Sequence, residues 1–205
     1  MLPVSAQQIQ SSCYQSLARC GFIRHAPFGL DWPINQDFHC WVRVNVRQRA
    51  RHFQIEPLVG IHAPLLEQFW TGLKVGPYRA AYRREIPTTS TSLLAIAGNR
   101  QPLVLDGDRK DGEAMEQLIA LYRETGLGFA RSTASYEAIE PVLRRSVRAL
   151  GGNPERLATC LYLMGRIDEA VAFVEDFAKV RPRYFNGFAL HFLMAMRPGA
   201  RCRRA

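Results

Sequence analysis

The fold is decided by the stretch HCWVRVNVRQRARHFQIEPLVGIH, residues 39–62, in which apolar and polar side chains alternate with a period of two. Such alternation is typical of a β-strand that turns one face toward a core. Val42, Val44 and Val46 share one face of the first run, and the pattern resumes in 53–61 after a short polar stretch. Two such runs joined by a short loop predict an antiparallel hairpin.

The opposite face of the first strand is polar and basic, and it is the candidate partner-binding surface. Its residues are His39, Trp41, Arg43, Asn45 and Arg47, followed in the turn by Arg49 and Arg51. Burying guanidinium groups without partners is costly, so this face is expected to be exposed or covered by an acidic partner. Trp, Arg and Asn together are typical of interface hot spots, and they also suit stacking and phosphate contact on single-stranded RNA. The alternative is a solvated outer face with Trp41 covered by the helices that follow.

The segments that flank the hairpin indicate more strands and a first helix. Ser5 and Gln8 have the spacing of a capping box, which predicts a helix over residues 6–20. An irregular edge strand is expected within 22–32, and Pro64 is expected to open a short helix. Two further segments are strand candidates, namely 92–98 and 102–107.

From residue 111 onward the apolar period becomes helical. The predicted helices cover 111–122, 136–150, 156–164, 167–180 and 184–196, the last of them apolar on nearly every side. We therefore predict an α+β fold in which an N-terminal helix packs on an antiparallel sheet of three to five strands and a helical C-terminal half follows. The expected division is a sheet portion 1–107, a helical portion 108–197 packed on it as one compact unit, and a disordered basic tail 198–205.

Composition limits the classes of function. The chain has 205 residues, of which 47% are hydrophobic, and a formal net charge of +9. No apolar run approaches the length that spans a bilayer, and the N-terminus has no secretory signal, so a cytoplasmic protein without membrane contact is expected. The five cysteines are scattered without a CxxC pair and are interpreted as reduced core thiols. The basic charge suits nucleic acid or an acidic protein and does not choose between them.

Candidate catalytic and metal-binding groups are few. Asp106 and Asp108 end a strand candidate and resemble the aspartate pair of haloacid-dehalogenase phosphotransferases, yet the parallel βα units of that class are missing. Capping of the helix that begins near Asp111 is the favoured interpretation. His39 and His52 could face each other across the hairpin, but a lone histidine pair is more often surface than a metal site. No cofactor, no metal and no enzymatic activity are predicted.

Two resemblances to known families add to this. ATCLYLMGRIDEAVAFVEDFAKVRP, residues 158–182, resembles one tetratricopeptide-type helix pair. The run LARCGFIRHAP followed by CWVRVNV and HFQIEPLVGIH, with GLGFARSTASYEAIEPVL behind it, resembles a bacterial family of unknown function. Members of such families are suspected immunity or antitoxin partners of secreted toxins. The resemblance implies an α+β fold and carries no catalytic residue.

These observations predict a non-enzymatic binding protein, of the immunity type, that occludes a bacterial effector. A stoichiometric inhibitor needs complementary shape and charge and no chemistry of its own. The alternative is an accessory protein that binds RNA or DNA through the basic hairpin face. An aspartate-based phosphohydrolase is a distant third.

Overall fold

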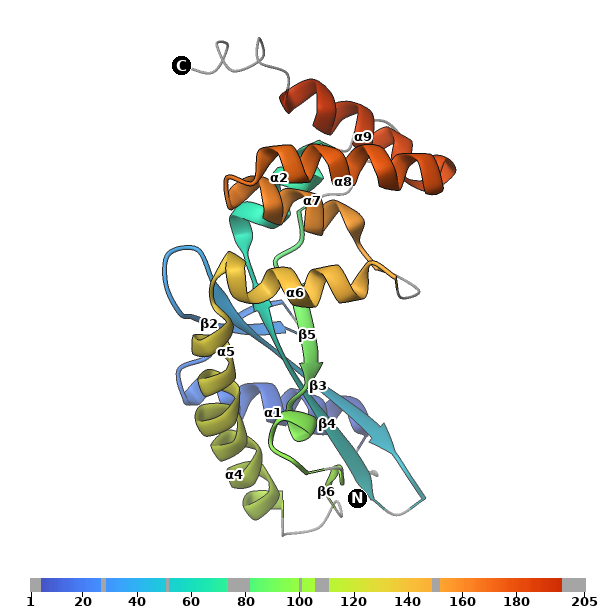
Figure 1. Ribbon diagram of the computed structural model, residues 1–205. Helices are drawn as coiled ribbons and strands as arrows, with labels where there is room; N and C mark the ends of the chain where they lie inside the picture. The colour runs from blue at the N-terminus through green and yellow to red at the C-terminus, as the bar shows by residue number, and fades with distance from the viewer. Residues whose placement is uncertain are drawn as a thin grey trace. The chain divides into compact units, whose positions relative to one another are not determined.

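The chain divides into two units, and each takes its residues from two separate stretches of the sequence (Figure 1). Unit 1 consists of Met1–His62 and Arg84–Ala134, and unit 2 of Ala63–Arg83 and Ser135–Ala205. The structure is a computed structural model. It describes residues 5–26, 29–50, 52–73, 82–99, 101–105, 111–148 and 152–196.

Unit 1 is built on an antiparallel sheet of six described strands in the spatial order β1-β2-β3-β4-β5, with β6 also paired to β4. The strands are β1 (Ile23–Ala26), β2 (Gly29–Pro33), β3 (His39–Gln48), β4 (Phe53–His62), β5 (Thr89–Ser92) and β6 (Leu103–Leu105). The long hairpin of β3 and β4 is its centre, with His39 opposite His62 and Gln48 opposite Phe53. The alternation in residues 39–62 therefore predicted the hairpin correctly.

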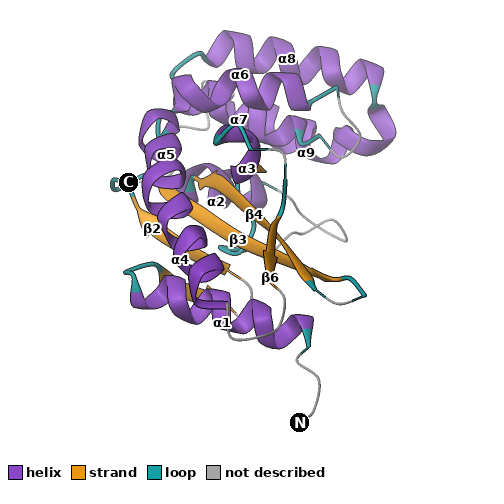
Figure 2. Ribbon diagram, turned by 90° about the horizontal axis from the view of Figure 1, so that it is seen from below, coloured by secondary structure: helices purple, strands orange, loops and turns teal. Residues whose placement is uncertain are grey.

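Helices cover one face of this sheet, which we call the helix-covered face. They are α1 (Ala6–Arg19), α4 (Asp111–Leu121), the π-helical turn η2 (Tyr122–Gly126) and α5 (Leu127–Thr133), with the short α3 (Leu93–Ile96) beside them. Figure 2 shows α1 and α4 lying along the sheet. The buried strand residues on this face are Cys40, Val42, Val44, Ile55, Val59 and Ile61.

Two buried tyrosines on the helices form hydrogen bonds with the backbone of the hairpin. The Tyr14 hydroxyl accepts a hydrogen bond from the Val44 amide at 3.1 Å, beyond Val42, where the pairing of β3 with the described part of β2 ends. The Tyr122 hydroxyl lies 2.7 Å from the Arg43 carbonyl oxygen and can donate to it. Burial raises the pKa of Tyr122 well above its ordinary value, so this hydroxyl keeps its proton.

Pro57 lies inside a central strand, where proline is rare because it cannot donate to the ladder. The pairing of β4 explains how the sheet accommodates it. β5 pairs with Leu58–Ile61 and β6 with Phe53–Ile55, so Pro57 falls in the gap between these two partners. Gly60, in contrast, lies where β4 does pair with β5, and its lack of a side chain permits that pairing. A Cβ there would lie 2.2 Å from the Thr89 carbonyl oxygen and would prevent β5 from pairing.

Unit 2 is helical. Its described helices are α2 (Pro64–Gly72), α6 (Tyr136–Ser146), α7 (Pro154–Leu163), α8 (Ile167–Val180) and α9 (Pro182–Met196). α7 packs against α2, α6 and α8, and α8 packs against α9. Arg156 on α7 and Glu67 on α2 form a buried ion pair, which ties α2 to helices that follow about ninety residues later.

The α+β class, the N-terminal helix, the antiparallel sheet and the helical C-terminal half are confirmed. The capping box is present, with the Ser5 hydroxyl accepting from the Gln8 amide and the Gln8 side chain accepting from the Ser5 amide. The tail 198–205 lies outside the described residues. None of the described helices combines the length and the apolar character needed to cross a membrane.

Three details differ from the sequence prediction. Residues 93–96 form the helix α3 because the Ser92 hydroxyl caps it by accepting from the Ala95 amide, so the strand predicted over 92–98 is confined to its first residue. The units do not divide at residue 107, since α2 belongs with the C-terminal helices and 111–134 with the sheet. Finally, α9 buries only one side, and its other side exposes Tyr184, Leu190 and Met194.

Candidate functional site

The polar face of the hairpin, which we call the second face, has two parts with different surroundings. The proximal part holds His39 and Trp41, and the distal part holds Arg43, Asn45 and Arg47. Trp41 is only 3% exposed, which contradicts the exposed interpretation and agrees with the alternative in which Trp41 is covered. The covering segment is not helical, as that alternative expected, but irregular. The distal residues are half-buried or exposed, as expected for the basic face.

Trp41 is buried because residues 84–88, which we call the strap, cross the proximal part of the second face. The Trp41 indole N–H donates to the Glu85 carbonyl oxygen at 2.9 Å. His62 Nδ1 lies 2.9 Å from the Ile86 carbonyl oxygen, and the Thr88 amide donates to the Ile61 carbonyl oxygen at 2.8 Å. These contacts give hydrogen-bond partners to buried polar groups of the sheet and the strap.

A buried carboxylate holds the start of the strap. Asp31 on β2 is 2% exposed and accepts a hydrogen bond from Arg84 Nε at 3.0 Å. Two imidazoles approach it at ion-pair distance, with His25 Nε2 at 2.7 Å and His39 Nδ1 at 3.5 Å. We call these four side chains the Asp31 cluster. It joins β1, β2 and β3 to the strap.

Burial controls the protonation of His39. Desolvation lowers its pKa, and the neighbouring Asp31 carboxylate opposes this effect without cancelling it. Arg84 and His25 face the same ring and also favour its neutral form. The folded protein therefore binds a proton on His39 less readily than the unfolded chain does.

This difference predicts a pH dependence of stability. A group whose pKa is lower in the folded state makes the unfolded chain bind more protons, so the free energy of unfolding falls as the pH drops below about 6.5. We expect the thermal midpoint of the wild type to decrease between pH 7.5 and pH 5.5, and His39→Gln to show a shallower decrease. His52→Gln, outside the cluster, is the control and should keep the wild-type slope. An unchanged slope in His39→Gln would contradict the prediction.

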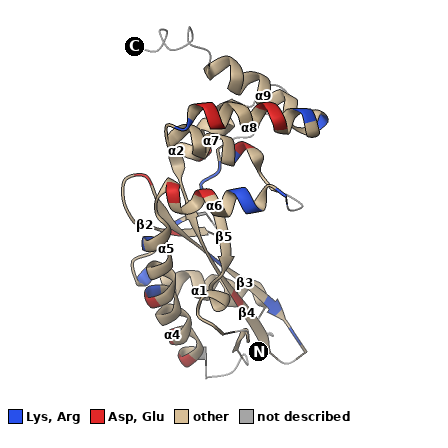
Figure 3. Ribbon diagram, viewed as in Figure 1, with Lys and Arg blue, Asp and Glu red and all other residues tan. Residues whose placement is uncertain are grey.

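The distal part of the second face remains open and carries an excess of positive charge. Arg47 Nη2 lies 3.2 Å from Glu56 Oε2, and Arg49 Nε donates to the neutral Gln54 side chain at 3.1 Å. Arg43 is exposed and has no ion pair within the part of the chain that the structure describes. Figure 3 shows the basic positions along β3. Arg51, the last residue of the predicted surface, lies outside the described residues.

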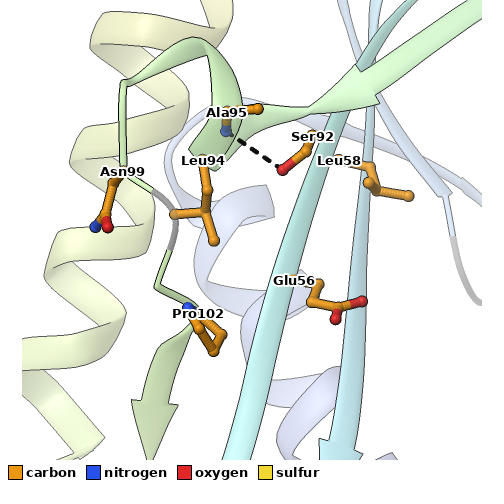
Figure 4. Close-up of a pocket in the computed structure, with 7 residues that line it drawn as sticks. All are labelled: Glu56, Leu58, Ser92, Leu94, Ala95, Asn99 and Pro102. Atoms are coloured by element: carbon orange, nitrogen blue, oxygen red, sulfur yellow. Dashed lines mark hydrogen bonds between the residues drawn. The ribbon is translucent and has the colours of Figure 1, made fainter.

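A cavity of about 420 Å³ adjoins this open surface (Figure 4). Glu56 and Leu58 of β4 form one wall, and both belong to the distal second face. The other lining residues are Ser92, Leu94, Ala95, Asn99 and Pro102. The lining is largely apolar with one carboxylate, which suits a single inserted side chain better than a polyanion.

The other candidate sites of the sequence analysis have different outcomes. His39 faces His62 across the hairpin with ring centroids 6.5 Å apart, so its predicted pairing with His52 is wrong. The register explains this, since His52 precedes β4 at the turn. Among the described residues, no group of three or more His, Cys, Asp and Glu is placed to hold a metal ion. Asp106 and Asp108 lie outside the described residues.

The sequence analysis missed the Asp31 cluster, although one signal was present. Asp31 interrupts the apolar run of β2, and an acidic residue in a buried strand needs a partner. That partner, Arg84, follows 53 positions later, in a segment without a regular period. Local patterns could therefore point to Asp31 but not to Arg84 or to the strap.

Comparison of the chain with family models, with curated proteins and with solved structures found no match. The resemblance to a family of suspected immunity proteins therefore stays a prediction.

Proposed function

We propose that this chain is a non-enzymatic binding protein of the immunity type, which occludes a bacterial effector with the distal part of its second face. One observation carries the proposal. The hairpin face beyond the strap is open and continues into the cavity beside Glu56 and Leu58. It presents Arg47, Arg49 and Arg43, the last of which has no ion pair among the described residues.

The structure of the hairpin suits recognition of a folded partner. β3 and β4 pair along their whole length, and helices pack behind them, so the arginine side chains project from a rigid backbone. Preorganised surfaces lose less entropy on binding. Positive charge on such a surface speeds encounter with an acidic partner, and a cavity at its border accepts an anchoring side chain.

The burial of Trp41 favours a protein partner over single-stranded RNA. Sequence-tolerant RNA binding depends on exposed aromatic rings on which bases stack. Trp41 was the aromatic residue of the predicted surface, and it lies under the strap with its N–H bonded to a backbone carbonyl. The distal part offers cations without an aromatic platform among its described residues.

Charge reversal tests the proposal. Arg43→Glu/Arg47→Glu should fold like the wild type, because Arg43 has no described ion pair and the Arg47–Glu56 pair is exposed. Binding to the effector should weaken about 100-fold or more, since two favourable contacts become repulsive. A candidate effector, sought among the products of the neighbouring genes and inactivated by mutation, would be the ligand in calorimetry, and co-expression with its active form would measure growth rescue.

The matched control is Arg123→Glu/Arg131→Glu, which changes the net charge equally at exposed positions of η2 and α5. It should bind and rescue like the wild type. Failure of the wild type to bind or rescue would overturn the immunity proposal. Salt-sensitive binding of a fluorescent single-stranded RNA, lost in the hairpin double variant, would replace it with the nucleic-acid alternative.

A further inference from the structure

Unit 2 has a surface groove that the hairpin face does not explain. α6 and α8 both pack against α7, and an ion network links them across the space between. Arg144 on α6 donates to Glu140 on its own helix at 2.6 Å and to Glu169 on α8 at 2.8 Å. Arg166, the N-cap residue of α8, also donates to Glu169, at 2.7 Å. This second hydrogen bond holds the carboxylate that Arg144 bonds across the two helices.

The α8 side of this groove is largely apolar, with two carboxylates among its lining residues. A hollow of about 400 Å³ is lined by Arg144 and by one face of α8, namely Glu169, Ala172, Phe173, Asp176, Phe177 and Val180. These positions follow the 3.6-residue period over three helical turns. Val180 is 71% exposed within the described part of the chain, and it extends the apolar lining formed by Phe173 and Phe177 into one contiguous patch.

The α6 side is basic. A second hollow of about 430 Å³ shares Arg144 with the first and is lined by Glu140, Pro141, Arg145 and Arg148. Arg145 and Arg148 are exposed, and neither has an ion pair within the described part of the chain. A largely apolar stripe therefore runs beside two cations for which the described residues supply no ion pair.

We propose that α6 and α8 form a docking groove for an amphipathic helix of a partner protein that carries carboxylates along one flank. Its apolar side chains, at i, i+3, i+4 and i+7, would cover Phe173, Phe177 and Val180, as in other helix-in-groove complexes. Its carboxylates would face Arg145 and Arg148. The last nine residues of this chain do not fit that description, since 197–205 carry four arginines and no acidic residue.

Two synthetic peptides test the groove. Each has 16 residues and leucines at i, i+3, i+4 and i+7, and they differ only in one flank, which carries glutamates in the first and lysines in the second. Fluorescence anisotropy with the full chain should show that the glutamate peptide binds at least about tenfold more tightly. NMR shift changes on binding should include Ala172 and Val180. Equal affinities, or shift changes confined to unit 1, would overturn the proposal.

Variants separate the apolar and charged contributions. Val180→Asp should weaken binding of the glutamate peptide at least about tenfold. It should leave the thermal midpoint unchanged, because the Val180 side chain is exposed. Arg145→Glu/Arg148→Glu should reverse the preference toward the lysine peptide. Val104→Asp, an exposed aliphatic position on β6, is the control and should bind like the wild type. If Val104→Asp also lost the preference for the glutamate peptide over the lysine peptide, the assignment of the binding site to the α6–α8 groove would be refuted.

Two other possible ligands of the groove, a second copy of the chain and RNA, would each give a different experimental result. A second copy of the chain would appear as a dimer in sedimentation that Val180→Asp abolishes. RNA would bind through the arginines alone, so Arg145→Glu/Arg148→Glu would abolish binding of a single-stranded probe while Val180→Asp would not. Either result, together with no binding of the glutamate peptide, would overturn the proposed occupant. None of these measurements uses the hairpin face, so the groove and the effector-binding surface can fail independently.

Discussion

Replacing Arg156 with methionine is expected to destabilise unit 2 by about 3–5 kcal/mol, because it leaves a buried carboxylate without its counter-ion. Glu67 is 3% exposed and holds Arg156 with both oxygens, at 2.9 Å from Nη2 and 2.9 Å from Nε. Trp70 also donates to Glu67 at 2.9 Å, but one neutral N–H cannot balance the charge. Urea unfolding of the full chain, followed by circular dichroism, measures the loss.

The double variant Glu67→Met/Arg156→Met separates two causes of instability: a buried carboxylate left without its counter-ion, and a change in how the side chains pack. Replacing a whole buried ion pair by apolar side chains of similar volume is often neutral, so the double variant should recover most of the stability. Lys179→Met is the control, since its ion pair with Asp176 is exposed, and its unfolding curve should match the wild type. A double variant as unstable as Arg156→Met would mean that the helix contact itself depends on the charges.

The same ion pair shows why the division into units could not be predicted. Pro64 correctly marked the start of α2, because that signal is local. α2 contacts the C-terminal helices through the ion pair of Glu67 with Arg156, which lies 89 positions later in the chain. Neither its charge nor its helical period indicates which distant segment it contacts. The helices were therefore predicted, and their grouping was not.

The candidate site was half predictable for a similar reason. The alternation in β3 identified the second face, and the distal residues Arg43 and Arg47 lie open as expected. The covering of Trp41 was one of two alternatives, but the covering segment was not predictable, because Glu85 in the strap follows 44 positions later. Alternation separates the two faces of a strand, but it does not reveal which part of a face another segment will cover.

The C-terminal helix α9 gives the other large expected effect. Phe185, Phe188 and Phe192 are each at most 4% exposed and form a continuous aromatic row, with ring centroids 5.2 Å and 5.4 Å apart. Phe185 continues this row to Phe177 on α8 at 4.9 Å, and Phe192 to Tyr162 on α7 at 6.3 Å. The core of unit 2 therefore includes one face of α9.

Deleting residues 183–205 is expected to unfold unit 2 or to cause aggregation, whereas deleting 198–205 should leave the thermal midpoint unchanged. Burying one large apolar side chain contributes about 1.5–3 kcal/mol. Losing three phenylalanines therefore removes a large part of a net stability that is typically about 5–15 kcal/mol. Light scattering and circular dichroism on the two truncated proteins give the measurement.

Paired substitutions on the two faces of α9 test the same assignment without shortening the chain. Phe188→Ala/Phe192→Ala should lower the thermal midpoint strongly, since each buried Phe→Ala change costs about 3–5 kcal/mol. Leu190→Ser/Met194→Ser changes side chains that are 58% and 51% exposed, so it should leave the midpoint nearly unchanged and reduce aggregation. If the 183–205 deletion were instead soluble, folded and more monodisperse than the wild type, α9 would be a detachable binding element and its place in the core would be wrong.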